Sequence, residues 1–122
     1  MKVYFACSSQ NIRKYLKEYN LIRNILIYLK QDIISYWIDR AFNHAANSHL
    51  TRKEELNIHD EGINAINNSD FLVTDVSFSS SSVGYQVGLA LSKKIPVLCL
   101  YSEEFGDKEA PQVIRAITSP LL

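Results

Sequence analysis

The chain has 122 residues, of which 47% are hydrophobic and 21% are charged, a composition typical of globular proteins. Thirteen lysine and arginine residues balance thirteen aspartate and glutamate residues, so there is no excess positive charge to hold a nucleic acid polymer or an anionic membrane surface. No apolar run approaches the ~20 residues that a membrane-spanning helix needs. We therefore expect one domain over residues 1–122, with no polymeric nucleic acid and no membrane as a partner.

The first half of the chain alternates short apolar segments with a longer amphipathic one. Residues 2–7 (KVYFAC) are apolar and β-prone, and residues 11–30 repeat apolar side chains at helical spacing. Residues 33–38 (IISYWI) are β-branched and aromatic, which predicts a second strand. Residues 39–50 are weakly patterned and predict a loop with a short helix.

The second half continues this alternation. Thr51, with Glu54 three residues later, forms a capping box that opens a helix to about Asn68. The segments after it predict a third strand, a serine-rich loop, a helix, a fourth strand and a final helix, at residues 71–76, 77–82, 84–93, 95–101 and 109–118. Alternating strands and helices predict a single doubly wound α/β domain, flavodoxin-like or Rossmann-like, with a parallel sheet of about four to five strands and helices on both faces.

In such folds, ligands bind beyond the carboxyl ends of the strands, where the strand order reverses. We therefore expect one crevice between residues 7–11 and residues 75–86, which follow the first and third predicted strands. Serine hydroxyls and backbone N–H groups at a helix N-terminus suit a phosphate or a sugar hydroxyl. A flexible polar loop explains a run of serines equally well.

The cysteines and histidines give no sign of a metal or redox centre. Cys7 and Cys99 lie at the ends of apolar runs and form no CxxC pair, which predicts reduced thiols in a cytoplasmic protein. His44, His49 and His59 lack the spacing of a zinc site. We therefore expect no metal and no cofactor.

Several short motifs resemble the nucleoside 2-deoxyribosyltransferase superfamily, in the same order and over nearly the whole chain. These motifs are residues 4–8 (YFACS), Ser69 and Asp70 with Val73 and Asp75, residues 82–88 (SVGYQVG) and residues 94–100 (KIPVLCL). The chain is most similar to the deoxynucleoside 5′-monophosphate N-glycosidase branch, and residues 82–88 are the most specific match. The resemblance implies a small nucleoside or nucleotide as partner, cleavage of an N-glycosidic bond, and a homodimer or higher homo-oligomer.

Gln86 occupies the position at which this family carries its nucleophilic glutamate. That carboxylate attacks the anomeric carbon of the sugar and forms a glycosyl-enzyme that water or a second base resolves. A carboxamide carries no negative charge and is a poor nucleophile, so the change removes on the order of several kcal/mol of transition-state stabilisation. Gln86 is either an engineered replacement of glutamate that traps a ligand or a product of natural divergence.

Other positions also depart from the family pattern. The family aspartate that orients the sugar or the leaving base aligns with Gly62, while the first-loop glycine and arginine align with Cys7 and the neighbourhood of Gln10. A single engineered change would leave these positions untouched, so they favour natural divergence. Asp60 and Glu61 adjoin Gly62, but a helix turns about 100° per residue, and neither is an automatic substitute.

The alignment gives the candidate site residues. The catalytic candidates are Gln86 and Asp75; Asp75 is a carboxylate at the end of the third strand that also suits a helix-cap or loop hydrogen bond. The ligand-binding candidates are Tyr4, Cys7, Ser8, Gln10, Ser80, Ser82 and Gly84. Tyr4 is expected against the sugar, although core packing explains this residue equally well.

Three functions fit these observations, and we rank them in the following order. The first is a nucleoside-binding or nucleotide-binding protein with little or no catalysis, because Gln86 and Gly62 replace two family carboxylates. The second is an active N-glycosidic-bond hydrolase or deoxyribosyltransferase acting on nucleosides or their 5′-monophosphates, in which Gln86 is engineered or Asp75 replaces the glutamate. The third is an interaction module without a small ligand, which leaves the serine-rich loop unexplained.

Overall fold

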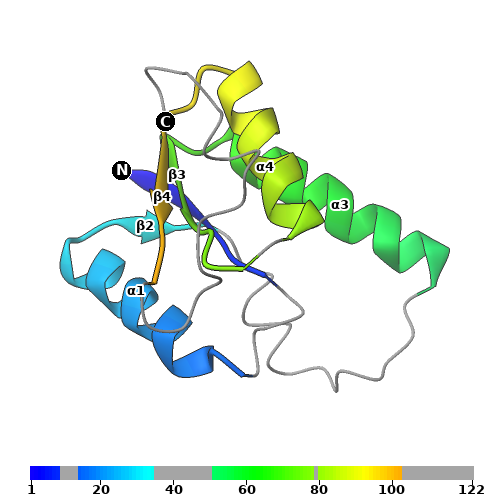
Figure 1. Cartoon of the computed structure of the whole chain (residues 1–122). Helices are drawn as coiled ribbons and strands as arrows, with labels where there is room; N and C mark the ends of the chain where they lie inside the picture. Colours follow the sequence, from blue (N-terminus) through cyan, green and yellow to red (C-terminus); the bar gives the residue numbers. More distant parts are fainter. Residues whose placement is uncertain (9–13, 35–50, 79, 103–122) are drawn as a thin grey trace.

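The computed structural model describes residues 1–8, 14–34, 51–78 and 80–102. Its elements are β1 (Lys2–Ala6), α1 (Leu16–Tyr28), β2 (Asp32–Ile33), α3 (Arg52–Asn67), β3 (Phe71–Asp75), α4 (Ser81–Ser92) and β4 (Val97–Leu100). The strands form a four-stranded sheet in the order β2-β1-β3-β4, with every neighbouring pair parallel. The sheet lies between α1 on one side and α3 and α4 on the other (Figure 1). This arrangement confirms the predicted doubly wound α/β fold.

Two apolar clusters cover the two faces of the sheet. Side chains alternate between faces along a strand, and β1 places Tyr4 on the α3 and α4 side but Phe5 on the α1 side. In β3, Leu72 and Val73 divide in the same way. Both strands are central and covered on both faces, which is why their sequences are apolar without alternation.

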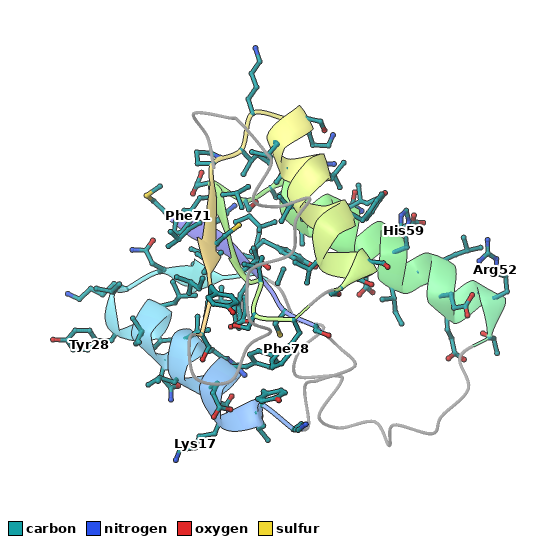
Figure 2. The ribbon with its side chains drawn as sticks, in the orientation of Figure 1. Lys17, Tyr28, Arg52, His59, Phe71 and Phe78 are labelled. Atoms are coloured by element: carbon teal, nitrogen blue, oxygen red, sulfur yellow. The ribbon has the colours of Figure 1, made fainter. Side chains whose placement is uncertain are left out.

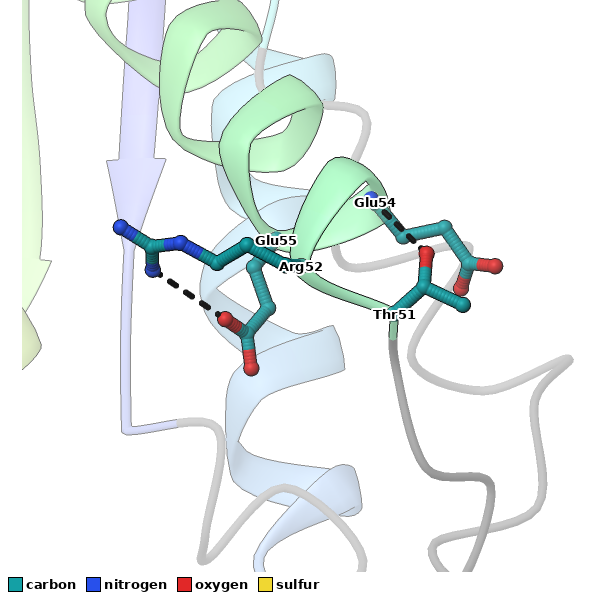
Figure 3. A network of polar contacts seen from close by, with 4 residues as sticks. All are labelled: Thr51, Arg52, Glu54 and Glu55. Carbon is teal, nitrogen blue, oxygen red and sulfur yellow. Dashed lines mark hydrogen bonds and ion pairs between the residues drawn. The ribbon is translucent and has the colours of Figure 1, made fainter.

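Helix α3 begins where the capping box predicts. The Oγ1 atom of Thr51 accepts a hydrogen bond from the backbone N–H of Glu54 at 3.2 Å. In the same turn, Arg52 forms an exposed ion pair with Glu55 at 3.4 Å (Figure 3). The hydroxyl satisfies one of the N–H groups that a helix start leaves without an intrahelical partner. The predicted start of this helix is confirmed.

Helix α4 begins at Ser81, three residues earlier than predicted. Ser80 is its N-cap, and the Ser80 Oγ atom accepts a hydrogen bond from the backbone N–H of Val83 at 3.3 Å. With this cap in place, Ser81 and Ser82 form the first helical turn. Their prediction as loop residues was therefore wrong.

Helices α1 and α4 end in the same way. Lys30 and Lys94 follow the two helices with positive φ angles of 59° and 60°. The backbone bonds that close the ends run from the N–H of Gln31 to the Leu26 carbonyl at 3.0 Å and from the N–H of Ile95 to the Ala90 carbonyl at 2.9 Å. This is the Schellman arrangement, which turns the chain sharply from the helix into the next strand and usually contains glycine at the left-handed position.

The remaining differences from the predicted bounds are small. β1 and β3 each end one residue early, β4 is shorter than residues 95–101, and α1 is shorter than residues 11–30. β2 lies at the start of the predicted second strand, whereas residues 35–38, the weakly patterned 39–50 and the predicted helix 109–118 lie outside the described residues. Within the described ranges, no helix is long and apolar enough to cross a membrane.

Candidate functional site

The strand order reverses between β1 and β3. From β1 the chain passes through α1 to β2 on one side, and from β2 it crosses through α3 to β3 on the other side of β1. The segments that follow β1 and β3 therefore diverge, and the carboxyl edge between them is the place where α/β sheets bind ligands. Ser8 and Ser77 lie in these two segments, and both are buried.

Tyr4 and Gln86 meet on the face of the sheet that α3 and α4 cover. The Nε2 atom of Gln86 donates a hydrogen bond to the Tyr4 hydroxyl at 3.0 Å, between residues 82 positions apart in sequence. Tyr4 is 1% exposed, and Gln86 is half-buried. Tyr4 is therefore both a core residue and a hydrogen-bonding partner, and its hydroxyl orients the carboxamide at position 86.

Gly62 reaches the same hydroxyl from α3. A Cβ atom built on Gly62 would lie 3.7 Å from the oxygen of Tyr4, an ordinary van der Waals contact. Apart from its chain neighbours and its own helix backbone, no other described heavy atom lies within 4 Å of that position. Tyr4, Gly62 and Gln86, from β1, α3 and α4, thus converge at one oxygen atom.

Asp75 extends from the opposite face of the sheet. Residues two apart on a strand share a face, and Val73 packs in the cluster that covers the α1 side. The Oδ1 atom of Asp75 accepts a hydrogen bond from the backbone N–H of Ser77 at 2.9 Å. Burial raises the pKa of the Asp75 carboxyl, and the hydrogen bonds from Ser77 oppose that rise. Asp75 closes the turn after β3, and the sheet separates its side chain from Gln86.

Cys7 lies with Asp75 on the α1 side. Cys7 is 2% exposed and packs in one cluster with Tyr19. Burial, and to a smaller extent the Asp75 carboxylate, raises the pKa of the Cys7 thiol far above its ordinary value, so the thiol stays neutral and unreactive. The sequence reading of Cys7 as a buried thiol is confirmed. The structure does not bring Cys7 to the Tyr4–Gln86 pair.

The predicted ligand residues of α4 surround its first turn. Ser80 uses its oxygen as the N-cap acceptor, whereas Ser82 and Gly84 are exposed. A Cβ atom at Gly84 would meet nothing within 4 Å, so the surface of this turn is open. Gln10 lies outside the described residues. The role of these four residues in ligand binding stays a prediction.

A contact between His59 and Tyr85 was not predicted from the sequence. The Nε2 atom of His59 lies 3.2 Å from the Tyr85 hydroxyl, and the Nδ1 atom of His59 lies 3.5 Å from the Asp60 carboxylate. His59 is on α3 (Figure 2), and Tyr85 is on α4. His59 precedes Gly62 by three residues and Tyr85 directly precedes Gln86, so this contact links the two helices next to the site.

A second contact that the sequence did not reveal fixes the segment after β3. The ring of Phe78 stacks on Tyr15, with centroids 4.3 Å apart and planes inclined by 30°, and Figure 2 shows Phe78 between β3 and α1. The backbone N–H of Ser102 donates to the Ser77 hydroxyl at 2.8 Å. Together these contacts hold the β3–α4 connection against α1 on one side and the end of β4 on the other.

The two side chains that this hydrogen bond joins, the Tyr4 phenol and the Gln86 carboxamide, are neutral. A phenol and a carboxamide can each donate and accept hydrogen bonds, but neither is a nucleophile at neutral pH. In the part of the chain that the structure describes, no group of three or more His, Cys, Asp or Glu side chains could hold a metal ion. The arrangement suits the recognition of a polar ligand better than covalent attack on one.

Known proteins match this chain over most of its length. A protein of Methanococcoides burtonii, provisionally named 2′-deoxynucleoside 5′-phosphate N-hydrolase 1, is 30% identical over 105 residues, which cover 83% of this chain and 80% of the relative. A Tetraodon nigroviridis protein named 5-hydroxymethyl-dUMP N-hydrolase is 31% identical over 108 residues, 87% of this chain and 73% of the relative. The chain belongs to the 2′-deoxynucleoside 5′-phosphate N-hydrolase family.

Membership of the N-hydrolase family confirms the resemblance to the deoxynucleoside monophosphate N-glycosidase branch. A Methanosarcina mazei relative with the same provisional name is 28% identical over 99 residues, 81% of this chain but only 60% of the relative. The chain thus spans 60% to 80% of the length of these three relatives. No protein-family profile matches it.

Proposed function

We propose that this protein binds a nucleoside or nucleotide at the Tyr4–Gln86 pair and cleaves it slowly or not at all. The observation that carries the proposal is the 3.0 Å hydrogen bond from the Gln86 carboxamide to the Tyr4 hydroxyl. It holds a neutral group at the position that the family resemblance assigns to the nucleophile. With Nε2 directed to Tyr4, the carbonyl oxygen Oε1 is the acceptor that this amide offers to a ligand.

The chemistry of the substitution explains why little cleavage is expected. Attack on the anomeric carbon needs an oxygen that carries negative charge, which also stabilises the positive charge that develops on the sugar. A carboxamide supplies neither. Gly62 removes the second family carboxylate from the same hydroxyl. Each lost interaction of several kcal/mol lowers the rate by several powers of ten.

The alternative, an active enzyme that uses another carboxylate, has less support from the geometry. Asp75 extends from the other face of the sheet and bonds to the backbone of Ser77. The Asp60 side chain is 71% exposed and lies beside His59. Neither carboxylate shares the face on which Gln86 contacts Tyr4.

Calorimetric titration with nucleoside 5′-monophosphates tests the proposed binding. We expect saturable binding, and we expect Tyr4→Phe to weaken it about fivefold because the variant loses the hydrogen bond that orients Gln86. The matched control is Tyr28→Phe, since Tyr28 is 85% exposed on α1, away from the site (Figure 2). Absence of saturable binding to the unmodified protein at millimolar ligand would contradict the proposal and favour an interaction module.

We also propose that the protein forms a homodimer or higher homo-oligomer. The support is the set of large apolar side chains exposed on α3 and α4 beside the site: Leu56 at 46%, Ile58 at 40% and Tyr85 at 52%. Such side chains gain stability when a second copy covers them. Sedimentation velocity measures the assembly directly, and a monomer at every concentration would refute it.

A further inference from the structure

Helix α1 carries two rows of apolar side chains, and only one of them packs against the sheet. The row on the sheet side consists of Tyr19, Ile22 and Leu26. The second row consists of Leu21, Ile25 and Tyr28, which are exposed at 60%, 49% and 85%. These three residues follow one another at positions i, i+4 and i+7, so they lie in line along the helix surface. We call this exposed row the α1 stripe.

The α1 stripe is a contiguous apolar surface. Single exposed apolar residues are normal on a protein surface, whereas a contiguous group of them marks a contact with another molecule. Leu29, directly after the helix, is 56% exposed and enlarges the group. Figure 2 shows the Tyr28 side chain directed away from the sheet. The stripe therefore has the character of a protein–protein interface.

The charge beside the stripe indicates which partner fits it. Lys17 is exposed and precedes Leu21 by four residues, so it continues the row at the N-terminal end, whereas Tyr28 ends the row. The lysine cation is attracted to the face of an aromatic ring. The row thus has a cation at one end, an apolar centre and an aromatic ring at the other end. A second copy of the same row, running in the opposite direction, is complementary to it.

We propose that two copies of this chain associate through their α1 stripes, as antiparallel helices related by a twofold axis. Leu21 then contacts Ile25 of the partner subunit, and Lys17 lies over the ring of Tyr28 of the partner subunit. Each contact occurs twice, as a symmetric interface between identical surfaces requires. This inference adds a second contact surface to the proposed homo-oligomer, because α1 lies on the opposite side of the sheet from α3 and α4.

The same charges favour the antiparallel over the parallel arrangement. In a parallel pair, Lys17 would lie beside Lys17 of the partner subunit, and the two like charges would repel each other. In an antiparallel pair centred between Leu21 and Ile25, the two lysines are about 18 Å apart along the helix axis, at 1.5 Å per residue. That separation exceeds the screening length of about 8 Å at physiological ionic strength.

Sedimentation velocity of the full chain over a series of concentrations tests the interface. Ile25→Asn places a polar group at its centre twice per dimer, and we expect the dissociation constant to rise about a hundredfold. The matched control is Ile27→Asn. Ile27 is 55% exposed on the same helix but points about 200° away from Ile25, so we expect no change in association. Both variants carry the same cost in helix propensity.

Two further variants test the geometry of the contact. Lys17→Ala should weaken association about tenfold, because each dimer loses two contacts between a cation and the Tyr28 ring. Tighter association of Lys17→Ala would show that the two lysines repel each other, and it would overturn the antiparallel arrangement. If Ile25→Asn does not fold, as judged by circular dichroism, Leu21→Asn replaces it, because it alters the same contact.

The remaining outcomes separate this interface from the other proposals. Equal association of Ile25→Asn and Ile27→Asn overturns it, as does an assembly that Ile58→Asn on α3 dissolves and Ile25→Asn leaves intact. A monomer at every concentration also overturns it. If Ile25→Asn then lowers the free energy of unfolding more than Ile27→Asn does, another segment of this chain covers the stripe. Calorimetric titration of Ile25→Asn with nucleoside 5′-monophosphates should match that of the unmodified protein, so a failure of the proposed nucleotide binding is recognised separately.

Discussion

At the scale of single residues, the candidate site is organised around the hydroxyl oxygen of Tyr4. This oxygen accepts a hydrogen bond from the Gln86 amide, and it lies 3.7 Å from the position that a Cβ atom would occupy at Gly62. The sequence identified positions 4, 62 and 86 separately, through a resemblance, because Tyr4 matches the family pattern whereas Gly62 and Gln86 depart from it. It did not predict that they share one hydroxyl, since that depends on the rotational phase of α3 and α4 over the sheet.

Asp75 shows why residue type alone did not decide a role. The sequence placed it in the same crevice as Gln86, because Asp75 lies at the carboxyl end of the third strand and Gln86 lies in the helix that follows. The side-chain alternation of β3 places it on the α1 side, where it bonds to Ser77. Both faces of β3 are covered by apolar side chains, so its sequence has no alternation that could have told which face Asp75 occupies.

We predict that Asp75→Asn stabilises the protein at neutral pH. Burial raises the pKa of this carboxyl in the folded state. The protonated Asp75 carboxyl therefore makes its full contribution to the free energy of unfolding below the pKa of this group in the unfolded chain. That contribution is lost as pH rises through the higher pKa of the group in the folded state. Asparagine keeps an Oδ1 acceptor for the Ser77 N–H and carries no charge.

Urea unfolding at a series of pH values measures this effect. The variant should exceed the original protein in free energy of unfolding near pH 7, and the difference should shrink toward acid pH, where Asp75 is protonated. A variant that is less stable than the original at neutral pH would show that the ionised carboxylate contributes a favourable interaction. In that case, its hydrogen bonds would outweigh its burial.

At the scale of elements, local sequence signals predicted the start of α3 correctly and misplaced the start of α4. Thr51 was identified as the start of α3 because a capping box is contained in four residues. The start of α4 was misplaced because several consecutive serines can each act as the cap. The contact between His59 and Tyr85 joins two helices 26 residues apart, and no local pattern signals it.

The helix ends support a prediction about stability. Lys94 has a φ angle of 60°, a conformation that costs an ordinary residue energy and costs glycine almost none. Lys94→Gly should therefore stabilise the protein by about 0.5–1 kcal/mol. Relief of the backbone strain stabilises the folded state, and it outweighs the greater conformational entropy that glycine gives the unfolded chain. The midpoint of urea unfolding reports the change.

The neighbouring lysine provides the control. Lys93 caps α4 with a φ angle of −97°, which any residue adopts, so Lys93→Gly should destabilise the protein by a similar amount. If both glycine variants lose stability, the positive φ angle of Lys94 imposes no strain that glycine could relieve.

At the scale of the whole molecule, alternating strands and helices were sufficient to predict a parallel α/β sheet. The order β2-β1-β3-β4 is an additional finding, because alternation alone does not say on which side of β1 the chain continues. That order creates the reversal between β1 and β3, and it brings Tyr4 of β1 under the helices α3 and α4. We propose that this part of the sheet binds the family's ligand and that Gln86 and Gly62 alter its chemistry.

The most direct test measures base release from nucleoside 5′-monophosphates by the unmodified protein, by Gln86→Glu, and by Gln86→Glu combined with Gly62→Asp. We predict no release above the uncatalysed background from the unmodified protein, detectable release from Gln86→Glu, and faster release from the double variant. These results would show a binding site whose missing carboxylates limit cleavage. Release by the unmodified protein at a rate equal to that of Gln86→Glu would contradict the account, because the residue at position 86 would then not control the reaction.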